Sequence, residues 1–459
     1  MLMKMTKKLL SLALLACLVL SCLAGCGATS KDDGASGNGG QSTTGSTAPQ
    51  VEIVDYVSQL KLDMNSDTKK LEVTVRSFVD GDTVHFNTTD PHFVDGLLKA
   101  RFLAVDTPES TGRIEEYGKK ASRFTKEALK DAVSIIVESD TADWNADSTG
   151  SRFMSWVWYK TSADADYRLL NLEILQNGLA VASNTANNRY GDTCMAALSQ
   201  AKAQKLNLHS GEKDPEYYYG EVVELTLKEL RSNVNAYEGI KVGFSGVVTM
   251  NDNNTIYVEQ YDAETNMYYG MSVYLGFNLP GAGLEIVSVG NEAWIVGTVQ
   301  YYETGGTWQV SGLSYRAMAP DDPSNLKLIS TGNSPAYVPT DPATFNSGKV
   351  TLEVGEEMVT FPYAELALST SVLMENMKVV DVYTTTNEAS SSKGAMTLTC
   401  EVNGVRIDVR TAVLKDADGN LITESAFLGK TISVRGIVDY YMGGYQIRVL
   451  TMDNITIEK

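Results

Sequence analysis

Two short stretches decide how this chain is interpreted: residues 79–83 read VDGDT, and residues 101–109 read RFLAVDTPE. Together they place four carboxylates and an arginine within about the length of one hairpin. The carboxylates of Asp82 and Asp106, with a backbone oxygen near Thr107, would form a site of hard oxygen ligands. Such ligands prefer calcium or magnesium to softer metals. The two stretches therefore indicate a cation site.

The same stretches carry residues that suit phosphate chemistry. Arg101 could pair with a phosphate in bidentate fashion, because its guanidinium fork matches two phosphate oxygens. Glu109 could orient or deprotonate a water molecule, since a general base must lie close to the attacking nucleophile. A lone Asp-Gly-Asp is more often a solvated turn. The functional interpretation therefore depends on the second stretch accompanying the first.

The sequence resembles the thermonuclease (staphylococcal nuclease-like) family, whose signature pairs a DGDT turn with an R-x3-V-D-T-P-E strand and a later arginine. Both segments are present here in that order. The resemblance covers residues 71–213, including the NGLA segment at 177–180. It implies an OB-type five-stranded barrel with three helices. It also implies a hydrolase, a calcium-dependent endonuclease that cleaves phosphodiester bonds of DNA or RNA.

Carried over residue by residue, the resemblance implies a calcium site and a catalytic group. Asp82, Asp106 and the carbonyl of Thr107 would bind calcium, and Asp80 would support the ion through water as an outer ligand. Three residues would act on the substrate: Arg101 would bind the scissile phosphate, Glu109 would activate water, and Arg152 would stabilise the charge that develops on the phosphate oxygens or protonate the leaving oxygen.

Three segments depart from the family pattern. Residues 147–151 read DSTGS, where the family usually has a Tyr-Gly-Arg run. Residues 181–185 read VASNT and lack tyrosines that contact the nucleotide in some relatives. An insert at 88–98 separates the two signature halves, and we expect a hairpin loop there. Affinity and base preference therefore cannot be carried over.

Apolar periodicity outlines the remaining elements of this region. Alternation of apolar and polar residues predicts strands, and apolar residues spaced three and four apart predict helices. The expected strands are 71–75, 99–105, 133–138 and 153–159, and the expected helices are 114–132, 169–176 and 193–206.

The amino terminus is typical of a bacterial lipoprotein signal, residues 1–26. Lysines precede the apolar run 9–20, and residues 23–26 read LAGC, which resembles a lipobox. Cys26 would then carry the lipid and become the first residue after cleavage. Residues 27–50 have the Ser, Gly and Thr composition of a flexible linker, and 51–70 form a lead-in segment. These features predict a protein anchored to the extracellular face of the bacterial cell membrane.

An internal repeat organises the carboxy-terminal half. Residues 290–302 read GNEAWIVGTVQYY and residues 429–441 read GKTISVRGIVDYY, each followed by a Gly-Gly turn and a further strand. Two copies of one β module are the economical explanation. We expect two small OB-like barrels, at 218–330 and 348–459, joined by a proline-containing linker at 331–347.

Composition narrows the chemistry further. The net charge is −19, whereas residues 71–213 hold 16 Lys and Arg against 20 Asp and Glu, a net of −4. Most of the acidity thus lies outside the predicted nuclease domain, but we still expect weak, salt-sensitive affinity for nucleic acid, because a net negative charge repels a polyanion. The chain has 3 histidines, which excludes His-dependent metal nucleases. Besides the lipidated Cys26, only Cys194 and Cys400 would remain after signal cleavage, so a disulfide framework is absent.

Two functions compete on these observations. The first is an extracellular nuclease, favoured because the whole set of signature residues is kept together. The second is a surface-binding or scaffold lipoprotein in which the nuclease fold is inactive and the carboxy-terminal modules hold a partner. Tyr301, Tyr302, Tyr440 and Tyr441 suit packing more readily than base stacking, and the ligand of these modules stays open.

Overall fold

The computed structural model describes residues 53–276, 279–303, 305–387, 390, 392–416, 418–441 and 443–458. The predicted signal peptide, with Cys26, and the predicted linker at 27–50 lie outside the described residues. Ile53–Lys459 forms one compact unit. Within the part of the chain that the structure describes, no helix is both long enough and apolar enough to cross a membrane.

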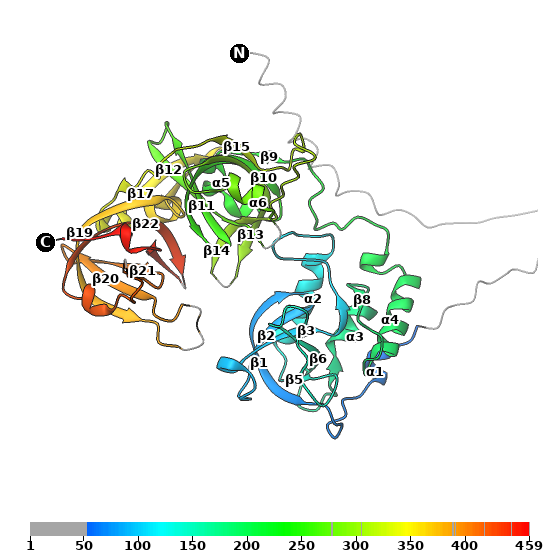
Figure 1. The fold of residues 1–459 in the computed structure, drawn as a ribbon. Coiled ribbons are helices and arrows are strands. Elements are labelled where there is room, and N and C mark those ends of the chain that lie inside the picture. Colours follow the sequence, from blue (N-terminus) through cyan, green and yellow to red (C-terminus); the bar gives the residue numbers. More distant parts are fainter. Residues whose placement is uncertain are drawn as a thin grey trace, which may run out of the picture. The chain divides into compact units, whose positions relative to one another are not determined.

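The first domain is a closed five-stranded barrel, coloured blue to cyan-green in Figure 1. β1 pairs with β2 and β5, β2 with β3, and β5 with β6, all antiparallel. The barrel closes where β3 runs parallel to β6, with Ala100 opposite Phe153. This is OB-type topology, as predicted. The barrel strands are β1 (Lys70–Asp80), β2 (Thr83–Asn87), β3 (Leu97–Phe102), β5 (Ser134–Glu138) and β6 (Phe153–Lys160).

Side-chain alternation along β3 explains how the barrel presents Arg101. Leu98, Ala100 and Phe102 are fully buried in the core, whereas Lys99 and Arg101 point to the other face. A short strand pair, β4 (Ala104–Asp106) with β8 (Val181–Ser183), continues beyond the barrel. The predicted strand at 99–105 is thus interrupted at Leu103, between β3 and β4.

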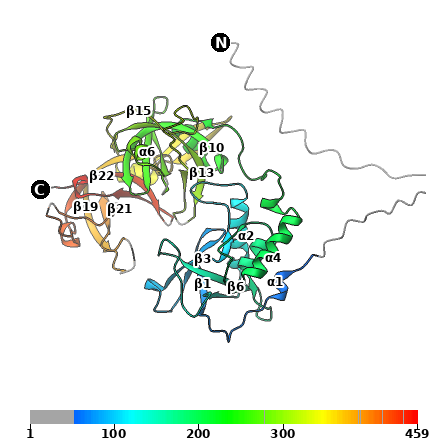
Figure 2. The same cartoon turned by 45° about the vertical axis from the view of Figure 1, so that its right-hand side comes forward.

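Helices pack on this barrel. Both views show α1 and α4 side by side (Figures 1 and 2), and the lead-in segment contributes a hydrogen bond from the Val54 amide to Gln200 at 2.8 Å. The predicted helix at 114–132 begins only at Gly118, because Tyr117 adopts the left-handed conformation and ends the preceding loop. The remaining elements are α1 (Tyr56–Gln59), α2 (Gly118–Lys130), α3 (Leu170–Gln176), α4 (Gly191–Ala203), β7 (Arg168–Leu169), η1 (Val94–Gly96) and η2 (Asn207–His209).

The insert at 88–98 packs on its own domain. Phe93 is buried, and its ring meets Trp144 and Phe153 edge to face at centroid distances of 5.3 and 4.9 Å. His92 stacks edge-on against Phe93 and Phe153. The loop therefore has an apolar anchor in the barrel core.

Two further OB-type barrels follow, which confirms the predicted fold class. In the second, β12 runs parallel to β14, and β10 closes on β13; in the third, β21 runs parallel to β23, and β19 closes on β22. The barrel strands are β10 (Lys241–Asp252), β11 (Thr255–Asp262), β12 (Met267–Tyr274), β13 (Glu292–Tyr302), β14 (Thr307–Ser311), β19 (Ser371–Thr384), β20 (Met396–Val402), β21 (Val405–Thr411), β22 (Thr431–Tyr441) and β23 (Gly444–Val449). The repeat seen in the sequence is β13 and β22, the fourth strand of each barrel.

The segment between these barrels is structured. The hairpin of β17 with β18 places Leu352 in the core cluster of the second barrel, beside Val242 and Phe244. Glu259 of the second barrel is buried and accepts hydrogen bonds from the amides of Ala336 and Ser371 at 2.8 Å. The elements here and at the barrel edges are β9 (Val223–Glu224), α5 (Leu227–Ser232), η3 (Val234–Tyr237), α6 (Gly281–Ile286), β15 (Lys327–Ser330), β16 (Val338–Pro339), α7 (Pro342–Ser347), β17 (Lys349–Val354), β18 (Glu357–Pro362), α8 (Tyr363–Leu366), η4 (Glu424–Ala426), η5 (Met452–Asn454) and β24 (Ile455–Ile457).

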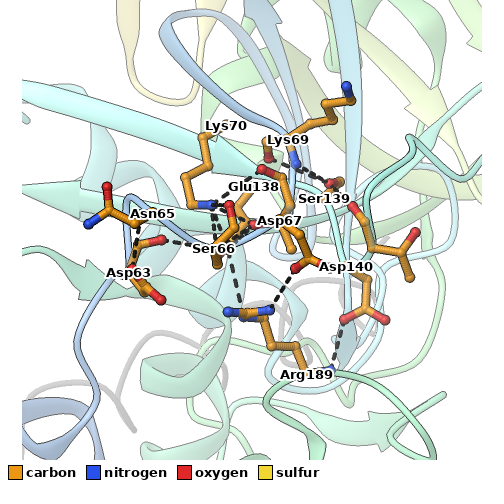
Figure 3. Close-up of polar contacts among 12 residues, drawn as sticks. Asp63, Asn65, Ser66, Asp67, Lys69, Lys70, Glu138, Ser139, Asp140 and Arg189 are labelled. Atoms are coloured by element: carbon orange, nitrogen blue, oxygen red, sulfur yellow. Dashed lines mark hydrogen bonds and ion pairs between the residues drawn. The ribbon is translucent and has the colours of Figure 1, made fainter.

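A buried carboxylate, Glu138, holds one end of the first barrel together. It is fully buried and accepts hydrogen bonds from Thr68 Oγ1 at 2.6 Å, Trp158 Nε1 at 2.8 Å and Tyr190 OH at 3.1 Å. Figure 3 shows Lys70 and Arg189 approaching it, at 3.6 and 3.9 Å from Oε1. The charge is therefore paired and its oxygens are satisfied, the condition under which a buried ion is tolerated.

We expect Glu138→Gln to destabilise the first barrel by about 3–5 kcal/mol, because Lys70 would keep a buried charge without its partner. Urea unfolding followed by tryptophan fluorescence measures this loss. Asp166→Asn is the matched control, because it breaks the exposed pair of Lys61 and Asp166, whose side chains are 60% and 78% exposed. Equal midpoints for both variants would contradict a structural role for Glu138.

Candidate active site

Arg101 joins the two signature stretches directly. Its Nη1 donates to Asp82 Oδ1, and its Nη2 donates to Asp106 Oδ1 at 2.5 Å. Asp82 is 1% exposed and sits at the β1–β2 turn, whereas Asp106 ends β4 and is half exposed. One guanidinium group thus spans both carboxylates, so their oxygens converge on a single position.

The Asp-Gly-Asp turn lies against Thr107. The Thr107 amide donates to Asp82 Oδ2 at 2.9 Å. A Cβ on Gly81 would lie 2.8 Å from Thr107 Oγ1, closer than real Cβ contacts allow. Glycine is therefore required for this approach. It brings Asp82 to the backbone of the second stretch.

A left-handed residue turns the chain between the two strands. Ala104 has a φ of 64°, a conformation that costs a non-glycine residue of order 1–3 kcal/mol. The turn lets β4 leave the barrel and pair with β8, where Asp106 lies opposite Val181. Asp106 consequently returns to within hydrogen-bonding distance of Arg101.

Asp80 and Glu109 form a second pair of carboxyl groups beside the first. Asp80 is 6% exposed, and its Oδ1 accepts from the Gly81 amide at 2.8 Å and from Ser110 Oγ at 2.7 Å. Burial, with a hydrogen bond and repulsion from Glu109, raises the pKa of Asp80 to about 8. Burial also raises the pKa of Asp82, against the opposing effect of Arg101. The site therefore carries more acidic groups than the single positive charge of Arg101 can neutralise.

The loop that carries Glu109 is held on several sides. The Glu109 amide donates to Glu115 Oε2 at 3.2 Å, and a Cβ on Gly118 would lie 2.1 Å from the Glu109 carbonyl oxygen. From β13 of the second barrel, Gln300 Nε2 donates to the Ser110 carbonyl at 3.3 Å. This leaves the backbone of the loop little freedom.

Arg152 lies apart from these contacts. It immediately precedes β6, the strand that runs parallel to β3 with Met154 opposite Arg101. Its Nε donates to Asp147 Oδ2 at 2.7 Å. Against the opposing effect of burial, hydrogen bonds from Thr149 and Arg152 hold the pKa of Asp147 below its ordinary value. The structure thus brings together Asp80, Asp82, Arg101, Asp106, Thr107 and Glu109, whereas the recorded ion pair of Arg152 is with Asp147.

The sequence interpretation missed two residues of this neighbourhood. Ser110 holds Asp80 through both its amide and its hydroxyl. Asp147 holds Arg152. The signal for Ser110 was its place directly after the signature glutamate. Asp147 gave no comparable signal, because only the loop before β6 turns it back on Arg152.

The donor set fits a hard divalent cation. Thr107 Oγ1 is buried without a hydrogen-bond partner among the described residues. It lies next to the carboxylates of Asp82 and Asp106 and to Asp80, whose pKa is raised to about 8. In the described part of the chain, no three His, Cys, Asp or Glu side chains stand in metal-binding geometry. The predicted ligands are two carboxylates and one carbonyl, and water completes the shell of such ions. Arg101 occupies the position between the carboxylates.

An OB barrel that presents converging carboxylates, an arginine and a held glutamate at one rim defines a nuclease-like domain. Residues 99–211 match the family model described as Staphylococcal nuclease homologue. The first barrel of this chain is therefore a domain of that family, as the resemblance implied. The match includes Arg101, Asp106, Glu109 and Arg152, and the Asp80–Asp82 turn joins them through β1 and β2 of the same barrel.

Proposed function

We propose that the first barrel is a calcium-dependent nuclease that hydrolyses phosphodiester bonds of DNA or RNA. The observation that carries the proposal is the bridge from Arg101 to both Asp82 and Asp106. A calcium ion bound by Asp82, Asp106 and the Thr107 carbonyl would supply the positive charge that offsets the acid of the site and the phosphate. Arg101 would then be free to turn its fork toward the phosphate.

The residues of the chain divide the remaining work. Glu109 orients a water molecule and accepts its proton while the water oxygen bonds to phosphorus. The bond from phosphorus to the leaving sugar oxygen breaks, and that oxygen takes up a proton from Arg152 or from solvent water. Arg101 and Arg152 stabilise the charge on the phosphate oxygens. Arg152 must therefore break its ion pair with Asp147 and pair with the phosphate of the substrate instead.

Cleavage of circular single-stranded DNA by the purified protein tests this function. We expect calcium-dependent linearisation that a chelator abolishes and that weakens as salt rises, because phosphate contacts are salt-sensitive. Linearisation also distinguishes endonuclease from exonuclease action, since a circle has no end. Binding of DNA without cleavage, at any calcium concentration, would instead favour the scaffold lipoprotein.

Calcium affinity is expected to rise by about tenfold per pH unit between pH 6 and pH 8, if one proton leaves on binding. The pKa of Asp80 is raised to about 8, so calcium must displace a proton below that value. Without calcium, the free energy of unfolding changes with pH in the opposite direction. It falls as pH rises through the raised pKa of about 8, because the buried Asp80 must then ionise. Calorimetry in two buffers counts the proton. Asp80→Asn should flatten the dependence, and an unchanged slope in this variant would contradict the assignment.

We also propose that Cys26 carries a lipid and tethers the protein to the extracellular face of the cell membrane. The support is the lipobox pattern and the Ser-, Gly- and Thr-rich stretch before residue 53. Cys26→Ser is expected to move the protein from the membrane fraction to the soluble fraction, and fatty-acid labelling of the unmodified chain should be lost with it. Membrane retention of the variant would contradict the anchor.

A further inference from the structure

A pocket of about 620 Å3 opens directly beside the candidate active site. Asp106, Thr107 and Pro108 of the signature stretch form one of its walls. The pocket therefore adjoins Asp106, one of the two carboxylates that Arg101 bridges. Its size lies within the range of small-ligand sites, roughly 300–1,000 Å3.

Two tyrosines give the pocket aromatic walls. Tyr117 is 6% exposed, and its hydroxyl lies 3.1 Å from both Ser210 Oγ and the Glu212 carbonyl oxygen. Its amide donates to Asp214 Oδ2 at 2.7 Å. Tyr217 is half-buried, and its amide donates to the Asp214 carbonyl at 3.2 Å. The Tyr117 side chain is thus held by hydrogen bonds, and the Tyr217 ring packs edge to face against Tyr219 at a centroid distance of 4.9 Å. Ile114 and Leu208 add apolar surface.

The charges around the pocket select against a phosphate. Arg113 is the one basic side chain among the described lining residues, against Glu115, Glu116 and Glu212 in addition to Asp106. A second phosphate group would be repelled by this surplus of carboxylates. A neutral planar ring with amino groups would instead donate hydrogen bonds to these carboxylates, because carboxylates accept hydrogen bonds from exocyclic amines.

We propose that this pocket is a nucleobase subsite for the nucleotide next to the scissile phosphate, and that it favours bases bearing an amino group over thymine. This inference rests on the proposed nuclease function. Tyr217 supplies a stacking surface, and the glutamates read the amino group. The Glu109 amide also donates a hydrogen bond to Glu115 Oε2 at 3.2 Å, so the base subsite and the catalytic glutamate share one loop.

The test compares single-stranded thymidylate oligonucleotides that carry one cytosine or adenine at a defined position. The unmodified protein is expected to cut preferentially next to the amino-bearing base. Tyr217→Ala should lower kcat/KM at that position by about tenfold, through KM, since base stacking on an aromatic side chain has this order of effect. Cleavage of plain thymidylate should fall less, because thymine lacks the amino group that holds a base in the pocket. Glu212→Gln should lower the ratio of cleavage beside the amino-bearing base to cleavage of plain thymidylate.

Tyr218→Ala is the matched control. Tyr218 belongs to the same tyrosine run, but its hydroxyl donates to the Glu221 carbonyl at 2.8 Å and it lies outside this pocket. Equal kcat/KM for the Tyr217 and Tyr218 variants, or cutting that ignores the base, would overturn the subsite while leaving the nuclease function standing. Absence of cleavage by the unmodified protein on every substrate would be a separate result, which overturns the nuclease function and the subsite with it.

Discussion

Replacing Arg101 by alanine is expected to lower kcat on single-stranded DNA by about 10²- to 10³-fold at saturating calcium, the usual effect of removing one group that stabilises transition-state charge. The structure gives a specific reason. Arg101 is the group whose two nitrogens reach both Asp82 and Asp106, and it leaves β3 on the face opposite the core. It therefore stands where the proposed phosphate and cation would meet.

Arg101→Lys sharpens this test. Lysine keeps the positive charge but loses the planar fork, so we expect most of the activity loss to persist. Because the buried Asp82 would lose its partner, thermal unfolding must be measured on both variants. Arg76→Ala is the control, since Arg76 is an exposed residue of β1 in the same barrel. Activity of Arg101→Ala within twofold of Arg76→Ala would contradict a role in phosphate binding.

Glu109→Gln is expected to lower kcat by about 10²- to 10⁴-fold, the usual contribution of a general base. The amide keeps the size of the side chain and removes its ability to accept a proton. The backbone of Glu109 is held by Glu115 and by the close approach of Gly118, so the variant should keep the loop in place. The loss should therefore fall on catalysis and leave calcium binding largely intact.

Single-turnover cleavage and calcium calorimetry separate these effects. The control is Glu127→Gln, which changes an exposed glutamate of α2. A Glu109 variant that turns over normally would show that another group activates the water. A variant that fails to bind calcium would instead assign Glu109 to the cation site.

Much of the first domain could be predicted from the sequence. The DGDT and RFLAVDTPE stretches predicted an OB-type barrel through their resemblance to the thermonuclease family, and each of them meets a local physical requirement in the structure. Gly81 must allow close approach to Thr107, and alternation along β3 must put Arg101 outside the core. The repeat at 290–302 and 429–441 likewise predicted two further barrels, since each copy supplies the same strand of its own barrel.

Other features depend on contacts between residues far apart in the chain. Nothing local requires Ala104 to adopt a left-handed conformation, which the pairing of β4 with β8 imposes. The pairing of Arg152 with Asp147 needs the particular turn before β6. The hairpin of β17 and β18 packs into the core of the second barrel although it lies beyond that barrel in sequence.

The sequence by itself thus determined the kind of chemistry, because a carboxylate, an arginine or a glycine brings its charge or conformational freedom wherever it is placed. Tertiary structure alone decided which of these groups share one environment. Burial around Asp80 and its closeness to Glu109, 29 positions along the chain, raise its pKa to about 8. The same is true of the pocket beside Asp106, whose tyrosines come from two separate segments. Burial and proximity are properties of the folded chain, since both depend on distances that residue order does not contain.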